Sequence, residues 1–243
     1  MRLPTLVELF GDRGTITGSP DLHPETGSNL DAGIVIAPTR AVPGTEGEID
    51  RVMIEAAGFA TRIHDTISLV PYAGSSAFHA ENIADAMTYG GELVMSARLH
   101  HLATVTANYT HLETQQISDN TIYDGKALPR QPADAFYGRV DAGYDRFSVY
   151  FDASFQAQTF LDQANLAPLP ARMLLGTGAR IAITSELGIS FAVANLADVR
   201  VENLALNPPP SPELAHVPTP LADYFGYPLP GRSYYLSLDW SHR

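Results

Sequence analysis

The chain has 243 residues, long enough for one sizeable domain or two small ones. Its formal net charge of −12 argues against a nucleic-acid partner, because phosphate backbones are bound by basic surfaces. The sequence contains no cysteine, which excludes disulfide bonds and thiolate metal sites.

The start of the chain, Met1–Thr5, lacks the apolar stretch that follows the basic residue of a signal peptide. No apolar run approaches the roughly 20 residues of a membrane-spanning helix. Apolar and polar residues instead alternate with a period of two, which is typical of β-strands. This alternation predicts about nine strands, around Leu30–Ile36, Met53–Ile67, Met87–Ala97, Val105–Tyr109, Phe136–Tyr144, Phe147–Phe160, Met173–Ile183, Leu187–Val201 and Tyr234–Ser241.

The clearest alternation lies at Phe147–Phe160, and the final segment repeats it. Successive side chains of a strand point to opposite faces, so each segment is expected to have one apolar and one polar face. The apolar face of the first segment comprises Phe147, Val149, Phe151, Ala153, Phe155 and Ala157, and its polar face Ser148, Tyr150, Asp152, Ser154, Gln156 and Gln158. In the final segment Tyr234, Leu236, Leu238 and Trp240 alternate with Tyr235, Ser237, Asp239 and Ser241.

The connections between these segments are short and long in turn. Short turns are predicted at 98–101, 144–147 and 184–187, and longer loops at 118–131, 161–170 and 202–230. This alternation favours a transmembrane β-barrel with short periplasmic turns and long extracellular loops over a soluble sandwich. In a barrel the apolar face meets lipid, whereas in a soluble sandwich it forms the core, and the sequence leaves that direction open.

Aromatic residues near the predicted strand ends suit the interfacial girdles of a membrane barrel, although strands in general are rich in aromatic residues. They are Tyr89, Tyr109, Tyr137, Tyr144, Tyr150, Phe160, Tyr234 and Trp240.

Four stretches stand in a fixed order along the chain. They are ELFGDRG with GSPDLHPE at 8–25, Asn82 with YGGEL at 89–93, ANYT with LPRQP at 107–132, and NL with GYPLPGR at 195–232. Together they resemble the C-terminal half of TonB-dependent receptors, with Ser19 and His23 in place of the usual Asn and Lys. Within these stretches, the residues expected to have a structural role as part of the family's motifs are Glu8, Leu9, Phe10, Gly11, Pro20, Leu22, Pro24, Glu25, Tyr89, Gly90, Glu92, Pro228, Pro230, Gly231 and Arg232.

The resemblance implies an all-β, antiparallel transmembrane barrel in the bacterial outer membrane, of which residues 1–243 form a C-terminal portion. The family's barrel has 22 strands around a plug, so the chain is expected to be a fragment that lacks the plug, the TonB-contacting segment, the signal peptide and the remaining strands. A self-associating half barrel is the alternative. The intact protein would import a scarce nutrient, such as a ferric siderophore, haem or cobalamin. Its implied partners are the TonB–ExbB–ExbD complex, outer-membrane lipid and the barrel-assembly machinery, although the chain ends Ser241-His242-Arg243 rather than on the family's aromatic residue.

No catalytic constellation stands out in the sequence, so an enzyme is not expected, nor is a cofactor or a metal site. In this family, ligand contacts come from the plug apex, the lumen wall and the loops. The candidates for the lumen wall are Asp152, Gln156, Gln158 and Arg180, with a generic polar lining as the alternative. Loop acids such as Asp119, Asp124 and Glu202 are expected to be solvated. The rival functions are a passive porin-type channel and a soluble all-β binding module.

Overall fold

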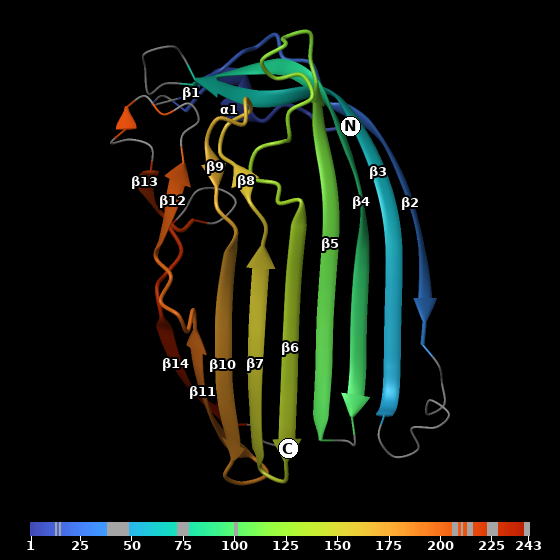
Figure 1. Ribbon diagram of the computed structural model, residues 1–243, viewed down its shortest axis with the longest axis vertical. Coiled ribbons are helices and arrows are strands. Elements are labelled where there is room, and N and C mark those ends of the chain that lie inside the picture. Colours follow the sequence, from blue (N-terminus) through green and yellow to red (C-terminus); the bar gives the residue numbers. More distant parts are fainter. Residues whose placement is uncertain are drawn as a thin grey trace.

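The computed structural model describes residues 1–12, 14, 16–37, 49–71, 78–99, 102–205, 209, 211–212, 216–222 and 228–240. In this part of the chain nearly all regular structure is β-strand, and one five-residue helix, α1 (Leu6–Phe10), lies near the N-terminus (Figure 1). None of the described helical structure is long and apolar enough to cross a membrane.

One large sheet dominates the molecule, and its strands are neighbours in the order β14-β11-β10-β7-β6-β5-β4-β3-β2. All pairs along this path are antiparallel. Every segment in which alternation predicts a strand overlaps one strand of the path. The bounds are β2 Thr26–Ile36, β3 Ile49–Pro71, β4 Phe78–Leu99, β5 Ala103–Ile117, β6 Asp134–Tyr144, β7 Phe147–Gln156, β10 Arg172–Ala182, β11 Leu187–Ala194 and β14 Ser233–Trp240.

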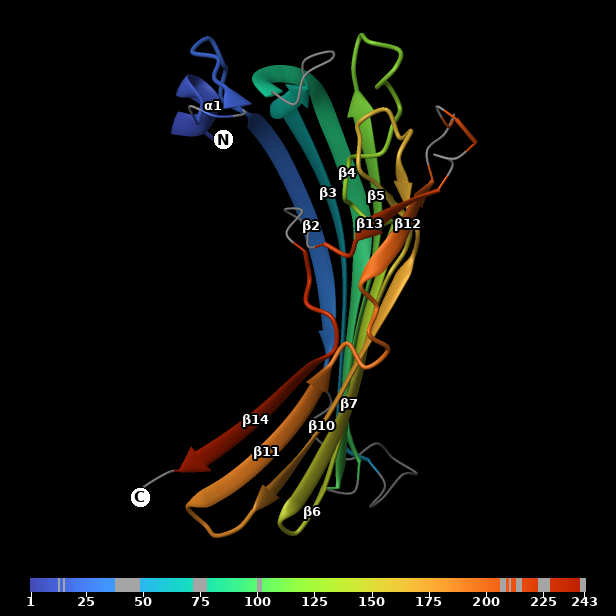
Figure 2. The same ribbon diagram turned by 90° about the vertical axis from the view of Figure 1, so that its left-hand side faces the viewer.

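The register of these strands gathers the apolar residues on one face. One row across five strands contains Ala142, Val149, Ala179, Phe191 and Leu236. This face is the more exposed one, since all of its β7 side chains except Ala153 are exposed, whereas most of those opposite are half-buried. The sheet is curved (Figure 2). Because the convex side of a curved sheet is the more accessible, the apolar face lies on the outside and the polar face on the inside.

The sheet is open rather than closed into a barrel. Among the described residues β2 pairs only with β3, and β14 pairs only with β11. The chain therefore forms a curved wall with two free edges.

The predicted strand Phe147–Phe160 is too long. The N–H of Ala157 still donates to the carbonyl of Asp134 (2.8 Å), and there the pairing with β6 ends. The chain then enters a separate two-stranded sheet, in which β8 (Thr159–Phe160) pairs with β9 (Pro168–Leu169). Gln158 lies between β7 and β8 and does not belong to the polar row of β7.

The predicted strand Leu187–Val201 also breaks, because Asn195 and Asp198 adopt positive φ angles of 52° and 57° after β11 ends. The following segment forms β12 (Val201–Ala205), which pairs with β13 (His216–Pro220). Two of the segments predicted as loops, 161–170 and 202–230, therefore contain paired strands.

Strands β3 and β4 are longer than predicted, at 23 and 22 residues. Their distal part bends across one end of the molecule, called here the upper end (Figure 1). Two register shifts, between Ile63 and Thr66 and between Thr66 and Ile67, accompany the bend, and Asp65 lies there with φ 57°. Beyond it, β1 (Ile16–Thr17) pairs in parallel with the start of β4. We call residues 64–71 and 78–82 the hairpin tip.

Three of the expected girdle aromatics lie elsewhere. Tyr137 and Tyr150 have the strand parity of the polar face, where the guanidinium of Arg139 lies 3.9 Å from the ring centroid of Tyr150. Phe160 belongs to β8. The residues of the set that have apolar-face parity are Tyr89, Tyr109, Tyr144, Tyr234 and Trp240.

Candidate functional site

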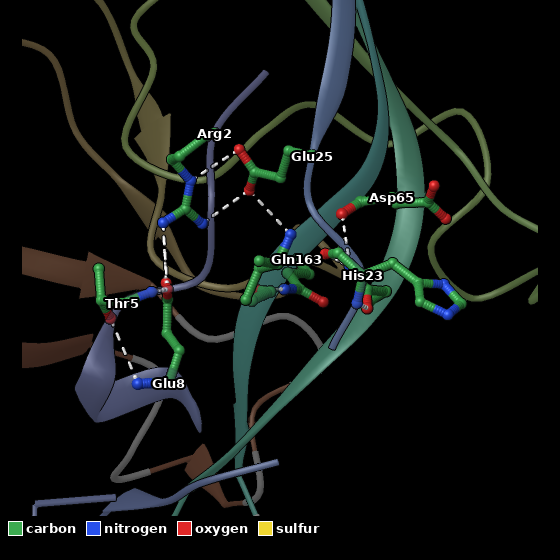
Figure 3. Close-up of polar contacts among 10 residues, drawn as sticks. Arg2, Thr5, Glu8, His23, Glu25, Asp65 and Gln163 are labelled. Carbon is green, nitrogen blue, oxygen red and sulfur yellow. Dashed lines mark hydrogen bonds and ion pairs between the residues drawn. The ribbon is translucent and has the colours of Figure 1, made fainter. Parts of the chain in front are cut away.

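The N-terminal motif forms a strap that is fixed by charge (Figure 3). Thr5 and Glu8 form a capping box that begins α1, since each side chain bonds the other's backbone N–H. Arg2 binds Glu8 at 3.1 Å and Glu25 at 2.8 Å, and Glu25 also accepts the N–H of Ile67 at 2.9 Å. The strap, which comprises residues 1–12, 14 and 16–25, is thereby tied to the hairpin tip.

The ion pairs and hydrogen bonds of the strap lower the pKa of two of its carboxyl groups. The hydrogen bond from Arg2 lowers the pKa of Glu25, against the opposing effect of burial. Burial would raise the pKa of Glu8, but hydrogen bonds from Thr5 and Arg2 outweigh it and the pKa is lowered. Both groups are therefore stabilised as carboxylates.

The other residues of this motif shape the strap. Leu9 and Phe10 belong to α1, and Gly11 ends it with φ 79°, a conformation that favours glycine. A Cβ at Gly11 would also lie 2.5 Å from the carbonyl oxygen of Ile16. Pro20, Leu22 and Pro24 lie between β1 and β2, in the stretch that leads to Glu25.

Asn82 connects the strap to the bend in the hairpin. Its amide oxygen accepts the N–H of His23 (2.9 Å), while its amide nitrogen donates to the carbonyls of His23 (3.0 Å) and Asp65 (2.6 Å). One side chain thus satisfies backbone groups of both the strap and the bend in β3. Farther along β4, Tyr89 and Glu92 lie on opposite faces, and Gly90 has no room for a Cβ, which would meet the carbonyl oxygen of His111 at 2.1 Å.

The last motif is a clasp before the final strand. The buried amide of Asn195 binds the N–H and C=O of Val199 and donates to the carbonyl of Pro230. Asp198 accepts from Arg200 (2.8 Å) and from the N–H of Arg232 (2.7 Å). The bond from Arg200, followed by that from Arg232, lowers the pKa of Asp198.

The two remaining motif residues belong to this clasp as well. A Cβ at Gly231 would lie 2.4 Å from the Nε of Arg200, so a larger residue would displace the Arg200 side chain that bonds Asp198. Pro228 forms an isolated antiparallel bridge with Ala222.

A cavity of about 310 Å³ lies where β7 ends and β10 begins. We call it the upper cavity. Arg172 is central to it: its Nε donates to Gln156 (2.9 Å), and its Nη1 contacts Glu202 (3.3 Å) and the carbonyl of Ala222 (2.8 Å). Glu202 is only 6% exposed, and a buried carboxylate requires such a partner. Arg130, Gln131, Thr219 and Pro228 complete the main part of the lining.

The predicted lumen residues do not form one site. Gln156 reaches the upper cavity, but Asp152 lies four residues farther along β7, roughly 13 Å away. Arg180 lies eight residues from Arg172, roughly 26 Å along β10, and contacts Asp239 at 3.7 Å. Asp152, Gln156 and Arg180 share the polar face, as predicted, while Gln158 is off the strand.

Sequence reasoning missed Arg172 and assigned Glu202 to solvent. The parity of β10 could have identified Arg172, because it lies on the same face as Arg180. Nothing in the local sequence indicates that Glu202 is buried, since its partner is thirty residues away.

The groups that line the upper cavity suit the binding of a ligand by hydrogen bonds. Among the described residues no group of three or more His, Cys, Asp or Glu side chains is placed to hold a metal ion. The upper cavity offers amide, guanidinium, hydroxyl and carboxylate groups, which can hold an oxygen-rich ligand by hydrogen bonds.

The chain is similar to known proteins over nearly its whole length. A family model described as "TonB dependent receptor-like, beta-barrel" matches residues 1–196. The "Iron-regulated outer membrane virulence protein" of Vibrio cholerae serotype O1 is 23% identical over 253 aligned residues, covering 98% of this chain and 35% of the relative. The chain thus spans about a third of the length of the curated relatives that it matches.

Solved structures agree in fold. The "Copper transporter OprC" aligns with a TM-score of 0.69 at 20% identity, over 99% of this chain and 36% of that one. The ferric enterobactin receptor PfeA from Pseudomonas aeruginosa aligns with a TM-score of 0.64 at 19% identity, over 98% and 36%. The siderophore receptor PiuA from Acinetobacter baumannii aligns with a TM-score of 0.64 at 17% identity, over 89% and 28%.

Proposed function

Because the chain belongs to the family of TonB-dependent receptor-like β-barrels, we propose that it forms part of the wall of a receptor that imports a scarce nutrient with energy from the TonB–ExbB–ExbD complex. Members of this family are receptors and transporters rather than enzymes, and this chain is a protein of the bacterial outer membrane.

The observation that carries the proposal is the contrast between the two faces of the sheet. The exposed apolar rows suit contact with lipid, and the half-buried polar rows suit a hydrated lumen. In this orientation the tight turns 145–146 and 183–186 face the periplasm. The strap, the hairpin tip and the upper cavity then face the outside, where a nutrient arrives.

For the cargo we propose an anionic iron chelate. Its iron is suggested by the names of the relatives, several of which are iron-regulated or bind ferric siderophores. Its charge is suggested by Arg172, whose contacts within the described part of the chain use Nε and Nη1, so that the Nη2 donors remain for an oxygen-rich ligand. Guanidinium groups bind carboxylate oxygens with strong, charge-assisted bonds.

Uptake by the receptor in its native host tests the proposal. We expect cells grown without iron to accumulate radiolabelled ferric siderophore, and we expect a protonophore to abolish this uptake because TonB uses the proton gradient. Deletion of the gene is the control for other receptors. A passive porin would continue to admit small solutes after protonophore treatment, and that outcome would overturn the energised mechanism.

A further inference from the structure

Among the described residues, five arginines have the strand parity of the polar face, and two of them lack a carboxylate partner. Three are in ion pairs, which are Arg139–Asp141 (2.6 Å), Arg172–Glu202 (3.3 Å) and Arg180–Asp239 (3.7 Å). The other two, Arg51 on β3 and Arg98 on β4, make no hydrogen bond or ion pair within the described part of the chain. The chain has 27 Asp and Glu residues against 15 Lys and Arg, so a shortage of carboxylates does not explain this difference.

The two unpartnered arginines lie directly opposite each other. Arg51 pairs with Arg98 in the register of β3 and β4, and the same row continues through Thr104 on β5 to Asp141 on β6. Side chains of directly opposed residues lie about 5 Å apart at Cβ, and like charges at such a pair are unfavourable. Both side chains are exposed on the polar face. The register therefore holds two guanidinium groups together in an arrangement that a negative partner would stabilise.

The carboxylates nearest in this register do not serve the pair. Asp141 lies two strands from Arg98, roughly 10 Å away at the usual strand spacing, and accepts two bonds from Arg139, at 2.8 and 2.6 Å. Glu55 shares the polar face but lies four residues from Arg51, roughly 13 Å along β3. Both arginines therefore keep their donors available to a ligand.

The arginine pair lies at the lower end of the wall, opposite the hairpin tip (Figure 1). β3 begins at Ile49 and β4 ends at Leu99, so each arginine is within two residues of the end of its strand. In the orientation proposed above, this end faces the periplasm. A solute that moves along the polar face would meet the pair as it leaves the lumen.

The chemistry of the pair selects an oxyanion. A guanidinium presents its N–H donors in a planar fork that matches the oxygens of a carboxylate or phosphate, and the bonds are charge-assisted. Two adjacent forks can hold one such group from both sides. We propose that Arg51 and Arg98 form a binding site for an oxyanion at the lower end of the lumen wall. Its role in transport rests on the proposed function: the site would hold a carboxylate of the anionic cargo before release.

Binding of inorganic phosphate and citrate to the assembled receptor tests the site. Line broadening in phosphorus NMR reports phosphate binding, and citrate should displace phosphate because it offers carboxylates to the same donors. We expect Arg51→Gln and Arg98→Gln each to weaken phosphate binding about fivefold at low ionic strength, since each removes a charge-assisted bond that solvent partly screens. Absence of phosphate binding to the native receptor would overturn the proposal.

The matched control is Arg146→Gln, which removes the same charge at the same end of the wall. Arg146 lies in the turn between β6 and β7 and contacts the carbonyl of Ile183 at 3.4 Å, away from the pair. This variant should retain phosphate binding. Equal weakening by all three variants would show a general effect of net charge and would contradict a site at the pair.

Thermal unfolding separates a binding role from a structural one. Because the pair is repulsive without a ligand, Arg51→Gln should raise the thermal midpoint in phosphate-free buffer by about 1 °C. It should also reduce the rise that phosphate gives the native receptor. A lower midpoint, with no effect of phosphate on the native receptor, would mean that the pair binds an acidic segment of the receptor instead. Neither measurement involves transport, so energised uptake can be present while the site fails, and the site can bind phosphate where uptake fails.

Discussion

Asn82 shows how one side chain can fix a bend in a long hairpin. An amide has one acceptor and two donor hydrogens, and here it bonds His23 twice and Asp65 once. The two bonds to His23 imitate a β-bridge between the strap and β4, and the third holds the residue with positive φ at the bend. The sequence motif that contains Asn82 is therefore structural in this protein.

The charge pair between Arg2 and Glu25 makes the docking of the strap dependent on pH. The folded pKa of Glu25 is lowered below its unfolded value of about 4.3. The resulting stabilisation is present above the unfolded pKa and is lost as the pH falls through the folded pKa. We therefore expect the N–H of Ile67, which donates to Glu25, to be equally protected from hydrogen exchange at pH 7 and pH 5, and to lose protection below about pH 4.

Glu25→Gln separates this effect from general acid unfolding. Between pH 5 and pH 7 the variant should lower the protection of Ile67 by about 1 kcal/mol, less than a fully buried charged hydrogen bond contributes because Arg2 is 43% exposed and screened. It should also remove the pH dependence in the acidic range. Hydrogen exchange with mass spectrometry measures both, and unchanged protection of the native protein down to pH 3 would contradict the assignment.

At the scale of the elements, the alternation of apolar and polar residues predicted the two faces best for strands that pair with a neighbour on both sides. Phe151 and Asp152 lie on the faces that the pattern assigns to them, because the ladders with β6 and β10 fix the register of β7. The two-residue strands β8 and β9 are too short to show a period. In β13 the prolines Pro218 and Pro220 favour a loop by composition, yet the segment pairs with β12.

The direction of the faces can be tested on β14. Leu236 has apolar-face parity and is 78% exposed, while its neighbour Ser237 has polar-face parity at nearly the same depth. In lipid vesicles we expect Leu236→Arg to destabilise the assembled receptor by about 2–4 kcal/mol, because a guanidinium enters hydrocarbon. Ser237→Arg should have little effect. Denaturant unfolding measures the difference, and a larger loss for Ser237→Arg would contradict the assignment of the apolar face to lipid.

At the scale of the whole molecule, the long-range contacts were the least predictable part. Local sequence gives no sign that Gln163 reaches Ser68, or that Glu202 meets Arg172, since 95 and 30 residues separate these pairs. Gln156 could be assigned to the polar face from the sequence, but the cavity that it lines exists only because β12 and β13 return to the sheet. The upper cavity is therefore a product of tertiary structure.

The two free edges determine how the 243-residue chain behaves by itself. Unpaired backbone groups in hydrocarbon cost several kcal/mol each, so we expect the isolated chain not to insert in vesicles unless β2 and β14 find partners. The sequence has no cysteine, so a disulfide between Asp31→Cys on β2 and Ser237→Cys on β14 would report edge pairing without background. Ser148→Cys with Ser237→Cys is the control, because β10 and β11 lie between those strands. If the chain inserts and resists protease while no disulfide forms between the edges, another element must cover them.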